Sequence, residues 1–424
     1  MANVLVIGSG GREHALCWRL KQSPSVAQVF CSPGNGGIGE DATCVALRGE
    51  ADIVRFCKEQ AIALVVIGPE QPLVEGLADT LSEQGIVVFG PGKLAAQLEG
   101  SKGFMKSICA KYGIPTAAYG YFTAHSEAKA FLQDKAYPLV VKADGLAAGK
   151  GVIIAADRKE AEEALSGMFA GQFGDSGKSV VIEEFLVGEE VSYFALCDGE
   201  TAIEFGYAQD HKRVGDGDTG PNTGGMGAYS PAPSMTPPLR ETVMHTIILP
   251  TVKAMKKEGC PFRGVLFAGL MLTEDGPMLL EYNVRFGDPE TQALMARFDA
   301  DLFLALEACG KAKTDGGGLD KVKISFRSDA SVCVVMAAKG YPGNYEKGTL
   351  IRGVDKANAM EDVKVFHAGT ELRNGQLLAT GGRVLGVTAI GATIAQAQEK
   401  AYQAVDVIDW PEGFCRRDIG WRAI

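Results

Sequence analysis

Short apolar runs separated by amphipathic stretches fill the first hundred residues. The apolar runs lie at residues 3–7, 28–31, 64–67 and 86–89, and stretches with helical periodicity, such as 73–84, lie between them. Buried parallel strands form continuous apolar runs, and crossover helices connect one strand to the next. The pattern predicts an α/β protein whose first domain, residues 1–100, is built on a Rossmann-like parallel sheet.

The pattern changes after residue 100. A helix is predicted to begin at Ser101-Lys102 and to end at Gly113-Ile114-Pro115, because glycine and proline terminate helices. Shorter elements follow, with strands at 120–123, 138–142 and 179–184 and helices at 126–133 and 157–169. These elements predict a small lid domain over residues 121–188. Strands at 191–197, 203–207 and 277–283 predict a larger central domain over 101–120 and 189–320.

The last hundred residues have a third pattern. Apolar strands are expected at 331–338, 364–368 and 383–387, and a helix from the N-cap Thr393 to Val407. The glycine run at Gly316–Gly318 marks the expected boundary. We expect a small α+β domain at 321–424 that carries no catalytic constellation and packs beside the nucleotide site.

Composition narrows the class of protein. The 424 residues are 46% hydrophobic, which is sufficient for several cores, and the net charge is −10 without a basic cluster. No apolar signal segment or membrane-length run is present, and the ten cysteines form no Cys-x-x-Cys pair. We therefore expect a cytoplasmic protein with reduced thiols that binds small molecules, and neither nucleic acid nor membrane.

A lysine at the end of a strand is followed by a glycine-rich loop in Pro138–Val152. Val140 and Val141 are typical of a buried strand, Lys142 follows them, and Gly145, Gly149 and Gly151 occur in the loop. Glycines allow backbone conformations that bring N–H groups close to an anion. The segment predicts a phosphate site. The alternative is a solvated strand end followed by an ordinary loop.

A second glycine-rich turn, Gly8-Ser-Gly-Gly-Arg-Glu-His14, joins the first strand to a helix. A phosphate is stabilised at such a helix N-terminus. The third glycine of a dinucleotide fingerprint is replaced by Glu13, and the second strand ends in Cys31-Ser-Pro-Gly34 without an acidic residue. These features argue against binding of NAD at this turn and favour binding of a smaller phosphate compound. The alternative is a turn needed only for close packing.

Oxygen-bearing side chains alternate along the strand predicted at 277–283. Glu281 and Asn283 lie on one face of this strand, and magnesium prefers such oxygen ligands. Arg285, which follows, can hold a carboxylate or a phosphoryl group in a bidentate manner. The alternative is a cluster of ion pairs at a sheet edge. The preceding strand, Val265–Leu272, contributes no acidic residue.

The segment from Asp210 to Gly227 is polar and rich in glycine. Long segments of this kind within compact domains are functional or disordered. Pro221 and the Thr-Gly-Gly-Met-Gly cluster favour an ordered loop that presents N–H groups to an anion, with a flexible surface loop as the alternative. His211 has no partner at metal-ligand spacing, so we interpret it as a polar lining residue.

Five segments together resemble the phosphoribosylamine–glycine ligase family of the ATP-grasp superfamily. They are Gly8–Ala15, Gly68–Glu70, Lys142–Gly151, Gly220–Gly227 and Glu281–Glu290, and the resemblance spans essentially the whole chain. It implies an ATP-grasp fold and a monofunctional enzyme of purine biosynthesis. The implied reaction joins glycine to 5-phosphoribosylamine through a glycyl phosphate, with ATP cleaved to ADP and phosphate.

The resemblance also implies roles for individual residues. ATP would be bound by Lys102, Lys142, Gly149, Gly151, Glu183, Glu184, Phe185, Leu186 and Glu190, of which Glu190 would take the ribose hydroxyls. Phosphoribosylamine and glycine would be bound by Gly10, Gly11, Glu70, Asp210, Lys212, Thr223, Gly224, Gly225 and Arg285. Glu281 and Asn283 would hold Mg²⁺ or Mn²⁺. The catalytic residues would be Arg285, Lys142 and Asp210. Lys106 lies one helical turn from Lys102 and is an alternative ligand for the phosphates.

Three alternatives remain at this point. A dehydrogenase would bind a dinucleotide at Gly8–Gly11, and a nucleotide-sensing module would bind ATP without turnover. A relative in purine synthesis that acts on another carboxylate is the third, because the acceptor pocket cannot be deduced from residue spacing. Transient contact with neighbouring enzymes of purine synthesis is a further expectation.

Overall fold

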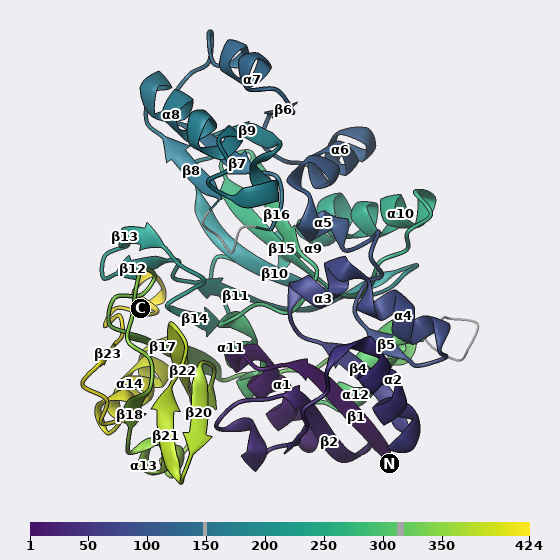
Figure 1. Ribbon diagram of the computed structural model, residues 1–424, viewed down its shortest axis with the longest axis vertical. Coiled ribbons are helices and arrows are strands. Elements are labelled where there is room, and N and C mark those ends of the chain that lie inside the picture. The colour runs from purple at the N-terminus through teal and green to yellow at the C-terminus, as the bar shows by residue number, and fades with distance from the viewer. Residues whose placement is uncertain (147–150, 312–317) are drawn as a thin grey trace.

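The computed structural model describes residues 1–146, 151–311 and 318–424 of the chain (Figure 1). Its N-terminal sheet has five parallel strands in the order β3-β2-β1-β4-β5. The strands are β1 (Ala2–Gly8), β2 (Val26–Pro33), β3 (Thr43–Cys44), β4 (Ile62–Ile67) and β5 (Val88–Phe89). Helices α1 (Gly11–Lys21) and α2 (Gly49–Glu59) are connections between them. The predicted Rossmann-like parallel sheet is confirmed.

The stretch predicted as helical at residues 73–84 is helical but interrupted. The stretch 73–84 forms two helices, α3 (Glu70–Glu75) and α4 (Leu77–Glu83), separated by Gly76. Gly76 has a φ of 106°, a left-handed conformation that a continuous right-handed helix cannot contain. Helix α5 (Gln97–Gly100) follows. Ser101 caps the N-terminus of α6 (Lys102–Tyr112), because its side chain accepts a hydrogen bond from the N–H of Phe104.

A four-stranded antiparallel sheet forms a separate unit at the top of Figure 1. Its order is β6-β9-β7-β8, with β6 (Tyr119–Phe122), β7 (Leu139–Ala143), β8 (Val152–Ala155) and β9 (Val180–Glu184). Helices α7 (His125–Phe131) and α8 (Arg158–Phe169) contribute buried side chains to the same small core. Lys142 is the penultimate residue of β7, at the end of the strand, as the sequence predicted.

A nine-stranded sheet connects the middle of the chain to its end. Strand β14 pairs with β11 on one side and β17 on the other, so the sheet continues across the predicted boundary near residue 321. The order is β16-β15-β10-β11-β14-β17-β22-β19, and β23 also pairs with β17. The strands are β10 (Glu189–Asp198), β11 (Ala202–Asp210), β14 (Gly227–Ser230), β15 (Arg263–Thr273), β16 (Gly276–Asn283), β17 (Ala330–Ala338), β19 (Val363–His367), β22 (Arg383–Gly391) and β23 (Gly413–Phe414).

Helices and a small sheet complete the structure. Helix α9 (Pro237–Val243) continues through a π-helical turn, Met244–Ile248, into α10 (Leu249–Lys257), and α11 (Glu290–Arg297) and α12 (Leu302–Gly310) follow β16. Near the C-terminus, β18 (Thr349–Ile351), β21 (Gln376–Ala379) and β20 (Thr370–Arg373) form a three-stranded sheet. Helix α13 (Val354–Asn358) precedes β19, and α14 (Ile394–Asp406) packs on β17 and β22.

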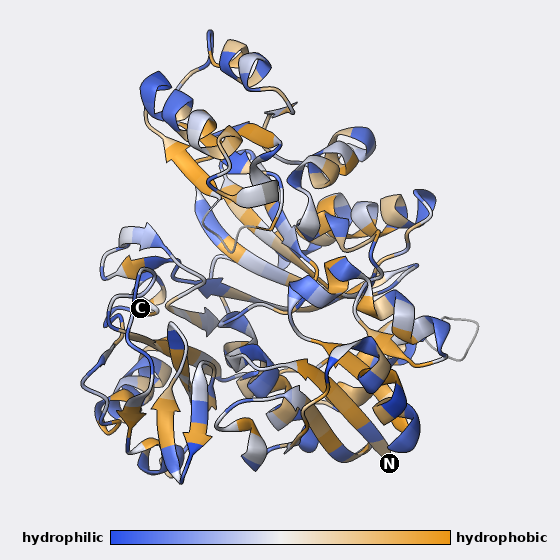
Figure 2. Cartoon of the chain, in the orientation of Figure 1, coloured by the Kyte–Doolittle hydropathy of each residue, from blue (hydrophilic) through white to orange (hydrophobic). Residues whose placement is uncertain are grey.

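Apolar residues are concentrated on the strands, as the orange ribbons of Figure 2 show. Cys17, Cys31, Cys57 and Cys109 are buried among them, and all ten cysteines are free. Burial raises the pKa of the Cys57 thiol to about 11, which agrees with its prediction as a small apolar residue. Across the described ranges, no helix is both long and apolar enough to span a membrane.

The segment after β11 is more regular than expected. The predicted loop at 210–227 contains a hairpin of β12 (Arg213–Gly215) and β13 (Thr219–Asn222). His211, which was interpreted as a polar lining residue, lines neither of the two cavities described below. It is fully buried, and its Nε2 accepts a hydrogen bond from the N–H of Gly420 at 2.9 Å.

Candidate active site

A cavity of about 650 Å³ lies where the N-terminal sheet, the central strands and the C-terminal region meet. Ten of the residues predicted from the sequence line it, and they come from segments far apart in the chain. These residues are Glu70, Lys102, Gly151, Asp210, Lys212, Thr223, Gly224, Glu281, Asn283 and Arg285. Ionisable side chains of both signs predominate in this set, as a site for phosphates and a carboxylate requires.

Arg285 lies among acidic and amide groups on the cavity wall. Its Nη2 is 3.0 Å from Glu99 Oε1 and donates to Asn283 Oδ1 at 3.0 Å, and its Nε is 3.4 Å from Glu70 Oε2. Burial raises the pKa of Glu99, whereas the guanidinium of Arg285 overcomes burial at Glu70 and keeps the pKa of that carboxyl low. Arg285 is thus a fixed cation at the site.

Glu281 and Asn283 lie on the same face of β16 and both reach the cavity. Burial opposes ionisation of Glu281, but Lys212 and Lys142 outweigh it and lower the pKa of the carboxyl. One carboxylate and one amide oxygen fit a hard cation whose shell is completed by phosphates and water. Within the described ranges, no three His, Cys, Asp or Glu side chains are grouped as a metal site. The two donors therefore suit a metal that arrives with a nucleotide.

The two candidate lysines of α6 lie in different surroundings. Lys102 lines the cavity, where its Nζ donates to the carbonyl of Gly145 at 3.2 Å, and burial lowers its pKa. Lys106 is fully buried, and its Nζ donates to Thr116 Oγ1 at 2.7 Å and lies 3.2 Å from Glu183. Only Lys102 of this pair reaches the cavity.

The residues predicted for the nucleotide lie mostly beside the cavity. Lys142 is buried with its Nζ 3.0 Å from the Glu183 carboxylate, while Glu184 accepts a hydrogen bond from the N–H of Ala118 at 2.8 Å. Phe185 is 38% exposed and Leu186 is half-buried, so this segment presents apolar surface after β9. Gly149 lies outside the described residues.

Asp210 is the last residue of β11, and Lys212 follows it two positions later. Both line the cavity. Burial raises the pKa of Asp210 to about 8, although Lys212 opposes this shift. Lys212 forms an ion pair with Glu190, the residue predicted for the ribose. The N–H of Thr223 donates to the carbonyl of Lys212 at 2.7 Å, and Thr223 Oγ1 accepts from the N–H of Gly225 at 3.0 Å. These bonds hold the two ends of the hairpin segment together.

Gly10 and Gly11, predicted to bind phosphoribosylamine, are not among the residues that line the cavity. The N–H of Gly10 donates to Glu13 Oε2 at 2.5 Å, and a side chain at Gly11 would meet Gln292 Nε2 at 2.5 Å. A side chain at Gly11 would therefore displace the amide of Gln292. The neighbouring Arg12 reaches the cavity instead, and its Nη1 donates to the carbonyl of Phe286 at 3.0 Å.

Among the cavity residues that sequence reasoning did not assign to the site are Arg12, Glu99, Tyr341 and Arg383. Arg12 lies in a motif that the sequence singled out, but Glu99 and Tyr341 lie in segments without a motif. Arg383 Nη1 donates to the carbonyl of Asp288 at 2.6 Å, and the Tyr341 hydroxyl accepts from the N–H of Gly224 at 3.2 Å. The C-terminal region, expected only to pack beside the site, thus forms part of its wall.

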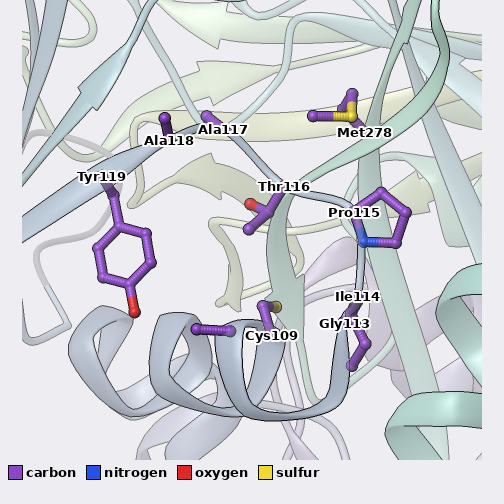
Figure 3. Close-up of a pocket in the computed structure, with 10 residues that line it drawn as sticks. Cys109, Gly113, Ile114, Pro115, Thr116, Ala117, Ala118, Tyr119 and Met278 are labelled. Atoms are coloured by element: carbon purple, nitrogen blue, oxygen red, sulfur yellow. The ribbon is translucent and has the colours of Figure 1, made fainter.

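A second pocket, of about 480 Å³, lies beyond the end of α6 (Figure 3). It is formed by the segment from Gly113 to Tyr119 together with Cys109, Ala110 and Met278, and none of these side chains is charged at neutral pH. This composition does not suit phosphate or carboxylate binding, so the larger cavity is the candidate active site.

Comparison with known proteins identifies the family. Three family descriptions match successive parts of the chain: Phosphoribosylglycinamide synthetase, N domain, at residues 2–99, its ATP-grasp (A) domain at 100–291, and its C domain at 331–422. The phosphoribosylamine–glycine ligase of Mesorhizobium japonicum is 57% identical over 424 residues, covering 100% of this chain and 98% of that protein. The chloroplastic phosphoribosylamine–glycine ligase of Arabidopsis thaliana is 56% identical, covering 97% of this chain and 79% of that protein.

Solved structures agree with the family found by sequence comparison. The crystal structure of the phosphoribosylamine–glycine ligase of Thermotoga maritima has a TM-score of 0.82 and 36% identity, covering 98% of this chain and 100% of that one. The biotin carboxylase of Campylobacter jejuni has a TM-score of 0.74 at 13% identity, covering 97% and 93%, and therefore shares the fold alone. The sequence matches and the fold lead to one conclusion: the chain belongs to the phosphoribosylamine–glycine ligase family, whose central domain is an ATP-grasp domain.

Proposed function

We propose that this protein joins glycine to 5-phosphoribosylamine, with ATP cleaved to ADP and phosphate, and so forms glycinamide ribonucleotide in purine synthesis. The observation that carries the proposal is the shared wall formed by Arg285, Glu281 and Asn283, which faces the same cavity as Lys102 and Asp210. A cation for a carboxylate, oxygen donors for a metal and a lysine for phosphates are the groups that activation of a carboxylate by ATP requires.

The reaction proceeds in two steps in this proposal. A carboxylate oxygen of glycine attacks the γ-phosphorus of ATP, the bond to the β-phosphate oxygen breaks, and ADP leaves, giving glycyl phosphate. The amine of phosphoribosylamine then attacks the carbonyl carbon, and inorganic phosphate leaves with the oxygen that came from glycine. The amine loses a proton in this second step. No covalent bond to the protein is required.

The residues of the chain position the substrates and stabilise the charge that develops on them. Arg285 orients the glycine carboxylate, and Lys102 stabilises negative charge on the phosphates. Asp210, which lines the same cavity, takes up the proton that the amine loses. Lys212 and the Thr223–Gly225 segment bind phosphoribosylamine. Glu281 and Asn283 would hold magnesium or manganese, which neutralises phosphate charge when it is bound.

ADP release by the purified protein tests the function. The mixture contains magnesium-ATP, glycine and freshly generated 5-phosphoribosylamine, and each component is omitted in turn. We expect ADP release only with all components present, and one glycinamide ribonucleotide per ADP. ADP release without glycine, or with another carboxylate in preference to glycine, would contradict the proposed substrate. ATP binding without any release would contradict the activity.

A further inference from the structure

The hairpin β12–β13 carries one wall of the candidate active site. Asp210 and Lys212 precede the hairpin, Asn222 is its last residue, and Thr223 and Gly224 follow it. All five line the cavity. Backbone bonds join the two ends: Thr223 donates to Lys212 at 2.7 Å, and the N–H of Met226 donates to the carbonyl of His211 at 2.8 Å. A shift of the hairpin would therefore move the wall.

The C-terminal segment at residues 416–420 contacts this hairpin through Arg416. The Arg416 side chain is fully buried. Its Nε and Nη2 donate to the two carboxylate oxygens of Asp418, both at 2.7 Å. Its Nη1 donates to the carbonyl of Arg213 at 3.0 Å and to Asp218 Oδ1 at 2.9 Å, both in the hairpin. Asp418 in turn accepts a hydrogen bond from the N–H of Gly217 at 2.8 Å.

The same segment is fixed to the C-terminal core. The Tyr402 hydroxyl, on α14, donates to the carbonyl of Arg416 at 2.9 Å and accepts from the N–H of Ile419 at 3.0 Å. The N–H of Gly420 donates to His211 Nε2 at 2.9 Å, at the base of the hairpin. The segment thus links a helix of the C-terminal region to a cavity wall that lies about two hundred residues earlier in the chain.

We propose that Arg416 is a positioning residue for the phosphoribosylamine half of the reaction, and that it acts by holding the hairpin at 213–222. Arg416 does not touch the cavity, since it is absent from the cavity lining. A buried arginine that satisfies two carboxylates and a backbone carbonyl is costly to replace, because each of those acceptors would lose a hydrogen bond. The proposal rests on the proposed function, because phosphoribosylamine is assigned to this wall there.

The test compares Arg416→Gln and Arg416→Lys with Arg417→Ala. Arg417 is the control because its side chain is 54% exposed and pairs with Asp406 at the surface. It also lies over the Tyr402 ring, while its backbone N–H keeps its bond to Asp216. Three quantities are measured for each protein: the KM for phosphoribosylamine, the dissociation constant for ATP, and hydrogen exchange in peptides covering 211–226 and the lid strands.

In Arg416→Gln we expect the KM for phosphoribosylamine to rise by about tenfold, because the wall loses its fixed position. Exchange should accelerate at 211–226 and stay unchanged in the lid, and the ATP dissociation constant should not change. For Arg416→Lys, the KM for phosphoribosylamine and the exchange rate at 211–226 should lie between the values for Arg416→Gln and for the unmodified chain. The reason is that lysine keeps the charge without the bidentate geometry. Arg417→Ala should match the unmodified chain.

Unchanged hairpin exchange, or faster exchange with an unchanged KM for phosphoribosylamine, would overturn the proposal. Weaker ATP binding together with faster exchange throughout the chain would also overturn it, because it would mark Arg416 as a general structural residue. If Arg416→Gln does not fold, Asp418→Asn is judged by the same criteria. If the unmodified protein fails the ADP-release test, the proposed function is wrong, whereas the exchange comparison still decides whether Arg416 holds the hairpin.

Discussion

Arg285 illustrates what the sequence can predict about a single residue. Its position two residues after Asn283 placed it at the end of a strand beside the metal ligands, and the structure places its guanidinium on the cavity wall. Its acidic partner Glu99 lies 186 positions earlier in the chain, and no motif surrounds it. Such a partner becomes visible only when tertiary packing brings the two segments together.

Replacement of Arg285 tests its proposed role. In Arg285→Lys we expect kcat to fall by about a hundredfold, since lysine keeps a charge but lacks the planar fork that orients a carboxylate. The ATP dissociation constant should be nearly unchanged, because Arg285 is assigned to glycine. Turnover equal to that of the unmodified protein at saturating glycine would remove Arg285 from the mechanism.

Glu281 tests the proposed metal site. In Glu281→Gln we expect turnover to fall by at least about a hundredfold, because a neutral amide is a weaker ligand for magnesium than a carboxylate. Titration with Mn²⁺ in the presence of ATP should show weaker metal binding. Glu274→Gln is the control, since Glu274 is exposed in the turn that precedes β16. Unaltered Mn²⁺ affinity in Glu281→Gln would contradict the assignment.

Elements were predictable where the apolar pattern was strong. The parallel strands β1, β2 and β4, the lysine strand β7 and the Glu-x-Asn strand β16 all lie where continuous or alternating apolar residues indicated them. The pattern failed at Gly76, because helical periodicity continues across the break between α3 and α4. It also failed at β12 and β13, which have only three and four residues and contact the C-terminal segment.

The break at Gly76 leads to a prediction at the scale of the element. In Gly76→Ala we expect a loss of about 1–2 kcal/mol in the free energy of unfolding, because a φ of 106° is strained for any residue with a Cβ atom. The added methyl group itself would meet no atom closer than 3.5 Å. Gly39→Ala, where no atom lies within 4 Å of the added group, is the control for urea unfolding. A change equal to that of the control would show that the break is not strained.

At the scale of the whole molecule, one sheet continues from the central to the C-terminal region. This sheet explains why residues from distant parts of the chain line the same cavity. Composition and periodicity placed the elements of the C-terminal region but gave no reason to connect β14 with β17. Consequently Tyr341 and Arg383 were not recognised as part of the site, although both line the cavity.

Buried histidines give the whole molecule a pH dependence. Burial lowers the pKa of His211 and of His367 to about 3 in each case, and it also lowers the pKa of His14. The usual pKa of a histidine, which applies in the unfolded chain, is 6.5. Between this pH and about pH 3, the unfolded chain binds protons that the native protein does not. The free energy of unfolding therefore falls as the pH falls through this window.

For a single such histidine we expect a loss of about 1 kcal/mol in the free energy of unfolding between about pH 7 and about pH 5.5. Urea unfolding at both pH values should therefore show a smaller pH dependence in His367→Gln than in the unmodified chain. His245→Gln, at an exposed position, should keep the original dependence. Equal dependence in His367→Gln and the unmodified chain would contradict the explanation.

The central claim is that ATP activates the glycine carboxylate in this cavity, and transfer of an oxygen isotope tests it most directly. Glycine labelled with ¹⁸O in both carboxylate positions is incubated with the protein, magnesium-ATP and 5-phosphoribosylamine, and the inorganic phosphate is analysed by mass spectrometry. A glycyl phosphate intermediate predicts one ¹⁸O atom in each phosphate and the other in glycinamide ribonucleotide. Phosphate without ¹⁸O, formed together with glycinamide ribonucleotide, would contradict the account.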